Sequence, residues 1–375
     1  MSDFQHGPPP QKIAFGIDAV QHLPGYLRSL GWRRVLLATT GSARRSGRAA
    51  QVEALLGETL AFTYDRVQPH VPAEQVDEAF RFAHEHAVDG VIGLGGGSAI
   101  GLAKGVAYVL NALRAGQASD PDGSGAAPPA MVAAIPTTYA GSEMTPMFGM
   151  TTRTDSGPRK VTTSDARVLP RLVIYDPALT VDLPPSLTAA TGLNALAHCV
   201  EAVYAVNRHP LSTQAALAGA HAIGRALPRC CAHGDDLDAR TEMLEGAHMA
   251  GKSVADVALG LHHGLCHVLG GSAGVPHGLA NAIILPHAMR FNLDATARQL
   301  DSLAAAMGLA SAPAAIDHIE ALIRNLGLPQ RLREVGVAQA DLPRLAHLAV
   351  ESKTVKNNPK RVGEAEVGEL LRGAW

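Results

Sequence analysis

Residues 90–98 read Gly-Val-Ile-Gly-Leu-Gly-Gly-Gly-Ser, and this stretch decides the fold of the first half of the chain. Its apolar start predicts a buried strand, and the pattern from about 99 to 113 predicts a helix directly after the glycines. Glycines let backbone N–H groups approach a phosphate closely, and a helix N-terminus adds partial positive charge there. We interpret the turn as a phosphate site with Ser98 as the helix N-cap; a plain glycine-rich turn is the alternative, because the spacing Gly-x-Gly-x-x-Gly is absent. The candidate cofactor-binding residues of this turn are Gly95, Gly96, Gly97 and Ser98.

Two further segments place a small-residue loop after a buried strand. The first strand covers 34–40 and is followed by a loop at 41–47 and a helix at 48–56; the second covers 131–135 and runs into a hydroxyl-rich loop at 136–143. Ligands of open parallel sheets bind beyond the carboxyl ends of the strands, so these loops are expected at one cofactor site. Their hydroxyls can bind ribose, phosphate or amide groups, or they can merely cap backbone N–H groups. The candidates are Thr39, Thr137, Thr138 and Ser142.

The segment between these strands and the second half of the chain carries weaker signals. Residues 115–130, rich in Gly, Pro, Ser and Asp, predict a surface loop. Alternating residues between 150 and 176 predict a β-hairpin with Gly157-Pro158 at its turn and 171–175 as its return strand. Its basic residues form either a solvated group of charges or a clamp for an anionic ligand. These are Arg159, Lys160 and Arg167.

The composition changes near 176–185, where strand patterns stop and helical patterns continue to the C-terminus. A chain of 375 residues is too long for one hydrophobic core, so two domains are expected. We predict an α/β nucleotide-binding domain with a parallel sheet at 1–180 and an all-α catalytic domain at 181–375, with the active cleft between them. Predicted helices of the second domain include 186–206, 238–268, 277–292 and 294–306.

Two clusters of polar residues stand out in the apolar second half. Asn194 and His198 are four residues apart, as are His263 and His267, so each pair shares one face of a predicted helix. His262 and the turn Pro276-His277-Gly278 lie close to the second pair in sequence. Any one of these histidines is explained equally well as a core residue held by backbone carbonyls. Because buried polar groups cost stability unless they are paired, a cluster of this size predicts a site.

Charge and sequence pattern exclude several classes of protein. The net charge of -2 gives no general basic field, so nucleic acid is not an expected partner. We find neither a secretory leader nor an apolar run of about 18 residues, and we expect a cytoplasmic protein without a membrane partner. The cysteines show no Cys-x-x-Cys pair. Cys199 and Cys266, beside the histidines, are interpreted as small buried thiols.

Taken together, the motifs resemble the iron-containing alcohol dehydrogenase superfamily, whose fold is shared with dehydroquinate synthase. They occur in the family's order and cover nearly the whole chain: Gly95-Gly96-Gly97-Ser98, Pro136-Thr137-Thr138, Asn194 with His198, His263-Gly264-x-x-His267 and Pro276-His277-Gly278. Within the superfamily, residues 97–104, 136–145, 265–271 and 358–375 are most similar to the maleylacetate reductase branch. That resemblance implies reduction of maleylacetate to 3-oxoadipate, in aromatic-compound breakdown, with NADH or NADPH as cofactor.

Asn194 is the position that separates the branches. Metal-dependent members have an aspartate there, which completes a ligand set with the residues matching His198, His263 and His277. An amide is a much poorer ligand than a carboxylate, so the resemblance implies that no metal is required; if Zn or Fe is bound, the three imidazoles hold it. Alcohol oxidation calls for a Lewis acid, whereas reduction of an enone needs only donors that stabilise an enolate. The catalytic candidates are Asn194, His198, His263, His277 and Lys252.

The resemblance also suggests partners and rivals. Maleylacetate is a dicarboxylate and needs cations, for which Lys252, Arg159 and Arg167 are candidates, while Lys160 matches a family position near the cofactor. Arg44 and Arg45 either hold a 2'-phosphate or form a solvated basic pair. A homodimer is expected. The alternatives are a metal-dependent alcohol or aldehyde oxidoreductase, to which residues 278–282 are more similar, and a lyase or binding protein on the same fold.

Overall fold

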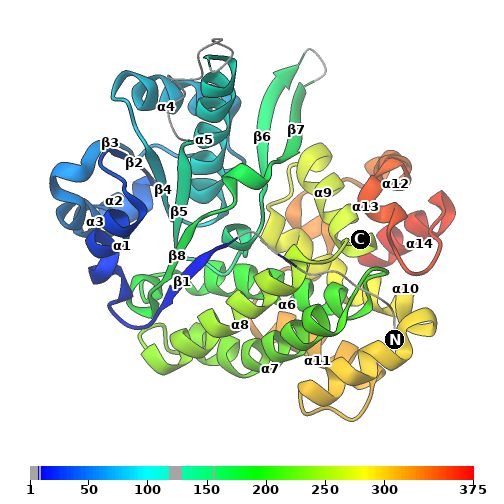
Figure 1. Ribbon diagram of the computed structural model, residues 1–375. Helices are drawn as coiled ribbons and strands as arrows, with labels where there is room; N and C mark the ends of the chain where they lie inside the picture. Colours follow the sequence, from blue (N-terminus) through cyan, green and yellow to red (C-terminus); the bar gives the residue numbers. More distant parts are fainter. Residues whose placement is uncertain (1–6, 8–9, 118–128, 155–156) are drawn as a thin grey trace. The chain divides into compact units, whose positions relative to one another are not determined.

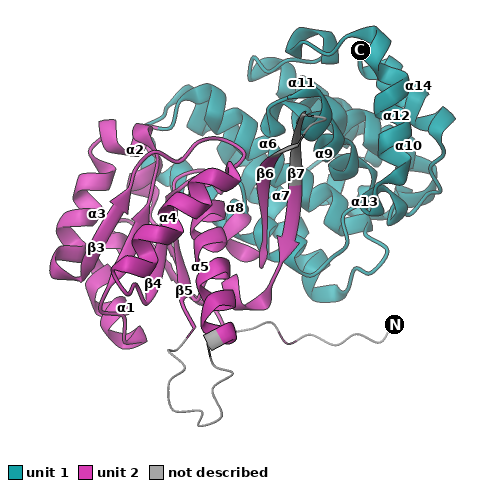
Figure 2. Cartoon of the chain, turned by 90° about the horizontal axis from the view of Figure 1, so that it is seen from above, with its two compact units in different colours: residues 1–4, 139–141, 183–375 teal, residues 5–138, 142–182 magenta. Residues whose placement is uncertain are grey.

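The computed structural model describes residue 7 and residues 10–117, 129–154 and 157–375, with the side chains at 117, 153–154 and 157–160 left out. The described residues form two compact units (Figure 2): unit 1 contains 139–141 and 183–375, and unit 2 contains the residues before 139 together with 142–182. The chain therefore enters unit 1 at residue 139, returns to unit 2 at residue 142 and enters unit 1 again at residue 183.

Unit 2 is built on a six-stranded parallel sheet with the order β1-β8-β5-β4-β2-β3. All residues of β2 and β4 are buried, as expected for parallel strands that are covered on both faces. The strands are β1 Lys12–Phe15, β2 Val35–Ala38, β3 Leu60–Tyr64, β4 Gly90–Gly95, β5 Met131–Pro136 and β8 Leu172–Tyr175.

Alternate residues of the strands pack into two separate cores. Leu36 and Val91 belong to the core shared with α4 (Ala73–Glu85) and α5 (Gly97–Gln117), while Leu37 and Ile92 belong to the core shared with α1 (Leu23–Leu30) and α3 (Arg48–Leu56). Figure 1 shows these helices around the sheet. The helices of this unit are α1 Leu23–Leu30, α2 Gly41–Arg45, α3 Arg48–Leu56, α4 Ala73–Glu85 and α5 Gly97–Gln117, with 3-10 turns at 19–22, 57–59, 142–144, 166–168 and 177–180. The predicted α/β fold class is confirmed for this half.

The predicted hairpin exists, but its return strand was placed wrongly. β6 Met147–Thr154 pairs antiparallel with β7 Gly157–Ser164, in a two-stranded sheet of their own. The segment at 172–175 is β8, whose residues are fully buried between β1 and β5. A short apolar run that is buried on both faces fits a central parallel strand better than a hairpin edge. Gly157-Pro158 begins β7, residues 155–156 lie outside the described part, and so does most of the surface loop expected at 115–130.

Two predicted boundaries around the loops that follow β2 and β4 also shift. Residues 41–45 form α2 instead of a loop, because the Thr40 hydroxyl accepts a hydrogen bond from the Ala43 N–H at 3.3 Å and caps the helix. Helix α5 begins at Gly97, and the Ile100 N–H donates to the Gly96 carbonyl at 3.2 Å. Ser98 therefore lies in the first turn of the helix and is not its N-cap.

Unit 1 is helical, which confirms the second half of the predicted fold class. Its helices are α6 Pro185–Tyr204, α7 Pro210–Ala232, α8 Leu237–Ala255, α9 Leu261–Ala273, α10 His277–Ala306, α11 Ala312–Asn325, α12 Leu342–Glu351, α13 Lys353–Lys356 and α14 Glu364–Ala374. Short 3-10 turns at 332–335 and 339–341 precede α12. Among the described helices, none has both the length and the apolar character needed to cross a membrane.

Long-range side-chain contacts decide two helix boundaries that the sequence pattern misplaced. The single helix expected at 238–268 is two helices, because the N–H groups at the start of α9 are bound by Glu201 and Asn358 from elsewhere in the chain. The two helices expected at 277–292 and 294–306 are one, α10. There the Asn292 amide pairs with the Asn358 amide, at 3.0 and 2.7 Å, so it does not compete for backbone groups.

Candidate functional site

One face of α6 carries three polar side chains into the interior of unit 1. Asn194, His198 and Glu201 are spaced by four and three residues, so they lie on the same side of the helix, and they are 4%, 7% and 1% exposed. The remaining residues of α6 from Thr188 onward are buried apart from Thr191. An apolar helix therefore holds this polar row in a fixed orientation.

The segment 139–141 packs against this face. The Asn194 Nδ2 donates to the Ala140 carbonyl at 3.3 Å. Gly141 has a φ of +76°, and a Cβ there would lie 3.5 Å from the Nδ1 of His198 and 3.5 Å from the Cα of Gly251. The preceding Tyr139 hydroxyl binds the fully buried Arg240 at 2.9 Å, which anchors the segment. A residue that favours a negative φ at position 141 would change the backbone that packs beside His198.

Glu201 orients His263. Its carboxylate accepts the backbone N–H groups of Gly260, His262 and His263 at 3.2, 3.1 and 3.3 Å, and its Oε2 lies 2.6 Å from the Nδ1 of His263. Burial raises the pKa of Glu201 to about 7, and the three N–H groups act in the opposite direction. The Leu261 N–H donates to the Asn358 Oδ1 at 3.2 Å. One carboxylate and one amide thus fix both the start of α9 and the ring of His263.

Hydrogen bonds also define the proton positions of the neutral imidazoles. The Nε2 of His262 lies 3.1 Å from the Asn281 carbonyl, which can only accept, so this nitrogen carries the proton and the Nδ1 of His262 does not. The Nδ1 of His263, 3.1 Å from that Nδ1 and close to Glu201, is then the donor. The Nε2 of His263 is therefore a hydrogen-bond acceptor. Burial first, and neighbouring imidazoles next, lower the pKa of His198 to about 3 and that of His263 well below its usual value.

Three polar atoms of the histidine cluster indicate that it binds a ligand. The imidazole of His198 stacks on that of His263, with centroids 4.7 Å apart and an interplanar angle of 14°, and the His277 ring lies 6.1 Å from His263 and 5.8 Å from His267. Within the described part of the chain, three buried atoms of this group have no hydrogen-bond partner: Asn194 Oδ1, His198 Nδ1 and His263 Nε2. Unpaired buried polar atoms are costly, so together they indicate a ligand site.

The residues that the sequence predicted as catalytic fall into two groups. Asn194, His198, His263 and His277 are brought together, with His262 and His267 beside them. Lys252 lies on α8 directly after Gly251; it forms no hydrogen bond or ion pair with the described residues, and its charge lowers the pKa of His248 after the larger effect of burial.

A resident metal partly fits this donor set. Three imidazoles, one of them oriented by a buried carboxylate, suit Zn or Fe, whereas the amide of Asn194 is a poor fourth ligand. Ligand atoms of a second set, Glu201, His262 and His263, lie within 4.8 Å of one another. These atoms already bind each other and the N–H groups of α9, so this second set is a structural network.

The loops after β4 and β5, which the sequence predicts as the cofactor site, pack closely together. A Cβ on Gly93 would lie 2.8 Å from the Cα of Ile100, and a Cβ on Gly96 would lie 3.0 Å from the side chain of Thr138. Gly95 has a φ of +143°, and its carbonyl accepts the Thr137 N–H at 3.0 Å. Residues 96–98 at the start of α5 are half-buried, so the first turn of this helix is partly accessible next to Thr138. The close packing of this segment depends on glycine at 93 and 96.

Other predicted cofactor residues have structural partners. Thr39 is fully buried, and its hydroxyl donates to the Leu94 carbonyl at 2.9 Å. The carbonyl of Ser142 accepts from the buried Lys104 Nζ at 2.5 Å, and the same ammonium binds the Thr145 and Met147 carbonyls at 2.7 and 3.0 Å. Lys160 lies on β7, where its backbone is opposite Thr151; its side chain is outside the described part.

Apart from Lys252 and the exposed Arg45, the candidate cations are ion-paired or lie outside the described part. Arg167 forms an ion pair with Asp165 at 2.6 Å, and the side chain of Arg159 is outside the described part. Arg44 binds both oxygens of Glu53 at 2.6 and 2.7 Å and Asp65 at 3.0 Å, while Arg45 is exposed. Arg44 is therefore neutralised by carboxylates of its own unit.

Sequence reasoning missed four residues that this geometry depends on: Glu201, Asn281, Asn358 and Lys104. A signal for Glu201 was present, because it is an acidic residue in an apolar helix at the spacing of Asn194 and His198. The partners of Asn281, Asn358 and Lys104 are 19, 97 and 38–43 residues away, so no local pattern identifies them.

Comparison with known proteins covers the whole chain. The family profile described as iron-containing alcohol dehydrogenase matches residues 10–177, and the one described as Fe-containing alcohol dehydrogenase family, C-terminal, matches residues 188–375. Curated relatives include a maleylacetate reductase of Pseudomonas aeruginosa, 38% identical over 100% of this chain and 98% of the relative, and maleylacetate reductase 1 of Rhodococcus opacus, 36% identical over 100% and 97%.

Solved structures agree with the sequence comparison. The maleylacetate reductase of Agrobacterium tumefaciens is 33% identical with a TM-score of 0.87, and covers 100% of this chain and 99% of its own. A 1,3-propanediol oxidoreductase is 30% identical with a TM-score of 0.89, over 100% of both chains. The resemblance inferred from the motifs is thereby confirmed. The chain is an oxidoreductase that belongs to the iron-containing alcohol dehydrogenase family.

Proposed function

We propose that the chain reduces the conjugated C=C bond of maleylacetate to give 3-oxoadipate, with NADH or NADPH, in the breakdown of aromatic compounds. The observation that carries this proposal is Asn194, whose buried amide shares a face of α6 with His198, at the position where metal-dependent relatives have a carboxylate. The ring of His198 stacks on that of His263, and His277 lies next to His263. Full-length relatives that are named maleylacetate reductase, at 36–38% identity, support the same substrate.

The reaction needs one hydride, one proton and an environment for a transient negative charge. When bound, the reduced nicotinamide supplies the hydride, which adds to the alkene carbon farther from the ketone. The electron pair of the C=C bond then moves toward the ketone oxygen, and the enolate takes a proton at the carbon next to the ketone. Most of the catalytic contribution of the protein is therefore to place hydrogen-bond donors at the ketone oxygen.

The hydrogen-bond network divides this work among the site residues. Asn194 has a second amide hydrogen beyond the one bound to Ala140, and His198 and His277 are imidazoles that can donate to the enolate oxygen. The Nε2 of His263 is an acceptor, so in this scheme it orients a water molecule that gives one proton to the enolate carbon, and the hydroxide that results takes a proton from solvent. Lys252 is the described cation proposed to hold a substrate carboxylate.

The cofactor choice and the assembly are parts of the same proposal. Glu53 and Asp65 already bind the guanidinium of Arg44, so this arginine is not available to bind the 2'-phosphate of NADPH. This favours NADH over NADPH. We also propose a cytoplasmic homodimer, following the resemblance to the family. Light scattering on the purified chain tests the dimer, and the ratio of kcat/KM for the two cofactors tests the preference.

A metal-dependent alcohol or aldehyde oxidoreductase is the second candidate, favoured by the orientation of His263 through Glu201. In it, His198, His263 and His277 would hold Zn or Fe, and the ion would polarise the substrate oxygen.

One experiment separates the two functions. Oxidation of NADH and NADPH is measured with maleylacetate and with simple aldehydes, before and after treatment with a chelator, together with the metal content of the purified protein. Turnover of maleylacetate that survives metal removal supports the proposed function. Stoichiometric metal whose removal abolishes this turnover would refute the metal-free mechanism.

A further inference from the structure

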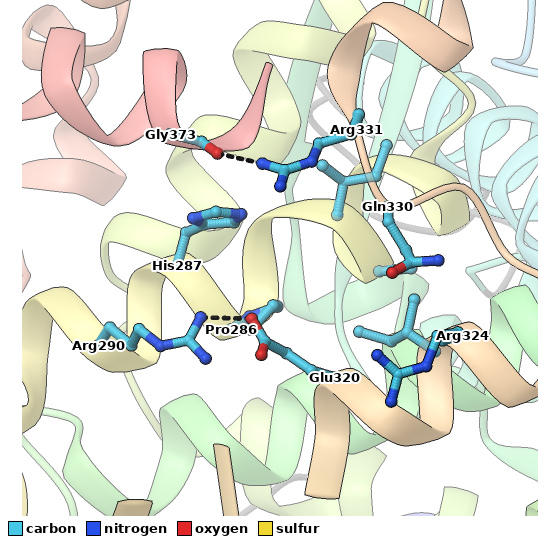
Figure 3. A pocket seen from close by; sticks show the side chains of 11 residues that line it. Pro286, His287, Arg290, Glu320, Arg324, Gln330, Arg331 and Gly373 are labelled. Carbon is cyan, nitrogen blue, oxygen red and sulfur yellow. Dashed lines mark hydrogen bonds and ion pairs between the residues drawn. The ribbon is translucent and has the colours of Figure 1, made fainter. Parts of the chain in front are cut away.

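Unit 1 contains a pocket of about 410 Å³ that shares no residue with the candidate active site. Its walls come from the middle of α10, from α11, from residues 330–331 and from Gly373 of α14 (Figure 3). A pocket of this size is within the range that holds small organic ligands. Its function is not explained by the proposed reaction.

The floor of the pocket is apolar. Ala282, Ile283 and Pro286 of α10 and Ile323 of α11 line it, and all four are buried. Pro286 has no N–H, and the other three side chains carry no polar atom, so the floor offers no side-chain hydrogen bond to a ligand. This floor gives a ligand a small apolar patch to contact, while most of the exposed lining around it is polar.

The rim, in contrast, is cationic. Figure 3 shows the Arg331–Gly373 contact on one side of the pocket, the Arg290–Glu320 pair on the opposite side, and His287 between them. Arg290 is neutralised, since it is ion-paired with Glu320 and also lies 3.6 Å from Asp317. The carboxylate of Glu320 is thus already ion-paired with the guanidinium group of Arg290.

Two guanidinium groups remain without a carboxylate of their own. Arg331 donates through Nη1 to the neutral Gly373 carbonyl at 2.6 Å, and it forms no ion pair with a carboxylate of the described residues. The guanidinium of Arg324 forms neither a hydrogen bond nor an ion pair with any residue that the structure describes, although its charge acts on Glu320. Burial, Arg290 and Arg331 all lower the pKa of His287, so this imidazole adds hydrogen-bonding capacity and no positive charge.

We propose that this pocket binds a small organic carboxylate, with its apolar body on Ala282, Ile283 and Ile323 and its charged group on Arg324 and Arg331. Guanidinium groups match carboxylates in shape and charge. A singly charged group suits the site better than phosphate, because Glu320 at the rim repels additional negative charge, and the floor gives phosphate nothing to pack against. The inference does not depend on the proposed function, since it involves none of the residues assigned to catalysis.

The test is calorimetric titration of the full-length protein with hexanoate, with neutral hexanamide and inorganic phosphate as comparison probes. We expect saturable binding of one hexanoate per chain and none of hexanamide. Arg324→Ala and Arg331→Ala should each weaken hexanoate binding about tenfold or more, because each removes a charged hydrogen bond. Arg298→Ala, which removes an exposed arginine from α10 outside the pocket, should bind hexanoate like the native chain.

Arg324→Ala is the cleaner variant, because its guanidinium forms no hydrogen bond or ion pair with the described residues and its removal should leave thermal unfolding and turnover of maleylacetate unchanged. The proposal is overturned if hexanoate does not bind, if hexanamide binds equally well, or if phosphate binds more tightly than hexanoate. Hexanoate binding that persists in both Arg324→Ala and Arg331→Ala would place the ligand elsewhere, and it would also overturn the proposal.

Discussion

Glu201→Gln tests whether a buried carboxylate sets the chemistry of His263. The substitution keeps the shape of the side chain and replaces one oxygen by an NH2 group. One oxygen of Glu201 accepts from the Gly260 and His262 N–H groups, and the other accepts from the backbone N–H and the Nδ1 of His263. The NH2 group is best tolerated in place of the oxygen that faces His263. There the Nδ1 of His263 can accept a hydrogen bond from it, if the ring proton moves to Nε2.

The magnitude follows from this rearrangement. One buried backbone N–H, that of His263, loses its acceptor, which costs about 1–3 kcal/mol of unfolding free energy. The Nε2 of His263 changes from an acceptor to a donor, so it no longer holds the water that we assign to proton delivery. Groups that orient a functional histidine typically contribute about tenfold to a hundredfold to activity, and we expect kcat with maleylacetate to fall in that range.

The assay needs a control variant that is destabilised about as much as Glu201→Gln but keeps His263 and Glu201. Asn292→Ala removes the amide partner of Asn358, and so destabilises the same region without touching His263 or Glu201. Urea unfolding gives the stability of both variants, and steady-state kinetics give kcat and KM below their unfolding transitions. If Glu201→Gln keeps the native kcat, or loses no more activity than Asn292→Ala at equal stability, the assignment of proton positions around His263 is wrong.

Three further predictions test other parts of the structure. Asn194→Asp should raise metal affinity and lower turnover of maleylacetate, as read from the metal content of dialysed protein and from kcat; an unchanged metal affinity would show that the amide is not what disfavours the ion. Gly96→Ala places a Cβ 3.0 Å from the Thr138 side chain. We expect the loss of one hydrogen bond to a cofactor phosphate, so KM for the nicotinamide cofactor should rise about tenfold while the thermal unfolding temperature shifts little. An unchanged KM would show that this loop does not contact the cofactor. The Arg44 guanidinium lowers the pKa of Glu53, so the pair stabilises the fold above about pH 4.5 and loses this contribution as the pH falls through the lowered folded-state pKa. Because the pair is partly exposed, Arg44→Met should cost about 1 kcal/mol at pH 7, and the difference in unfolding free energy from the native chain should shrink toward pH 3; a constant difference would contradict this account.

Local patterns were sufficient where a residue's neighbours in sequence are also its neighbours in space. The strand, glycine turn and helix at 90–117 follow from apolar runs and backbone freedom, and the pairs Asn194/His198 and His263/His267 follow from helix periodicity. His277 was included because its turn lies close to His263 and His267 in sequence, and the resemblance added its role. These parts of the fold and of the candidate site could be predicted from the amino-acid sequence.

The errors arise where distant contacts decide between local alternatives. Residues 172–175 are an equally good strand in a hairpin or in the main sheet, and only the pairing with β1 and β5 settles which. The break between α8 and α9 depends on Glu201 and Asn358, whose side chains satisfy N–H groups that a continuous helix would have bonded internally. Glu201 itself was overlooked because its role depends on a helix some sixty positions later in the chain.

The excursion of residues 139–141 into unit 1 has a consequence for anyone who recombines members of this family. A chimera joined at the boundary after residue 182 would take its helical half from one parent and residues 139–141 from the other. The helical half would then meet a foreign carbonyl at Asn194 and a foreign side chain at Arg240. A chimera designed to exchange substrate preference should therefore graft this tripeptide together with the helices.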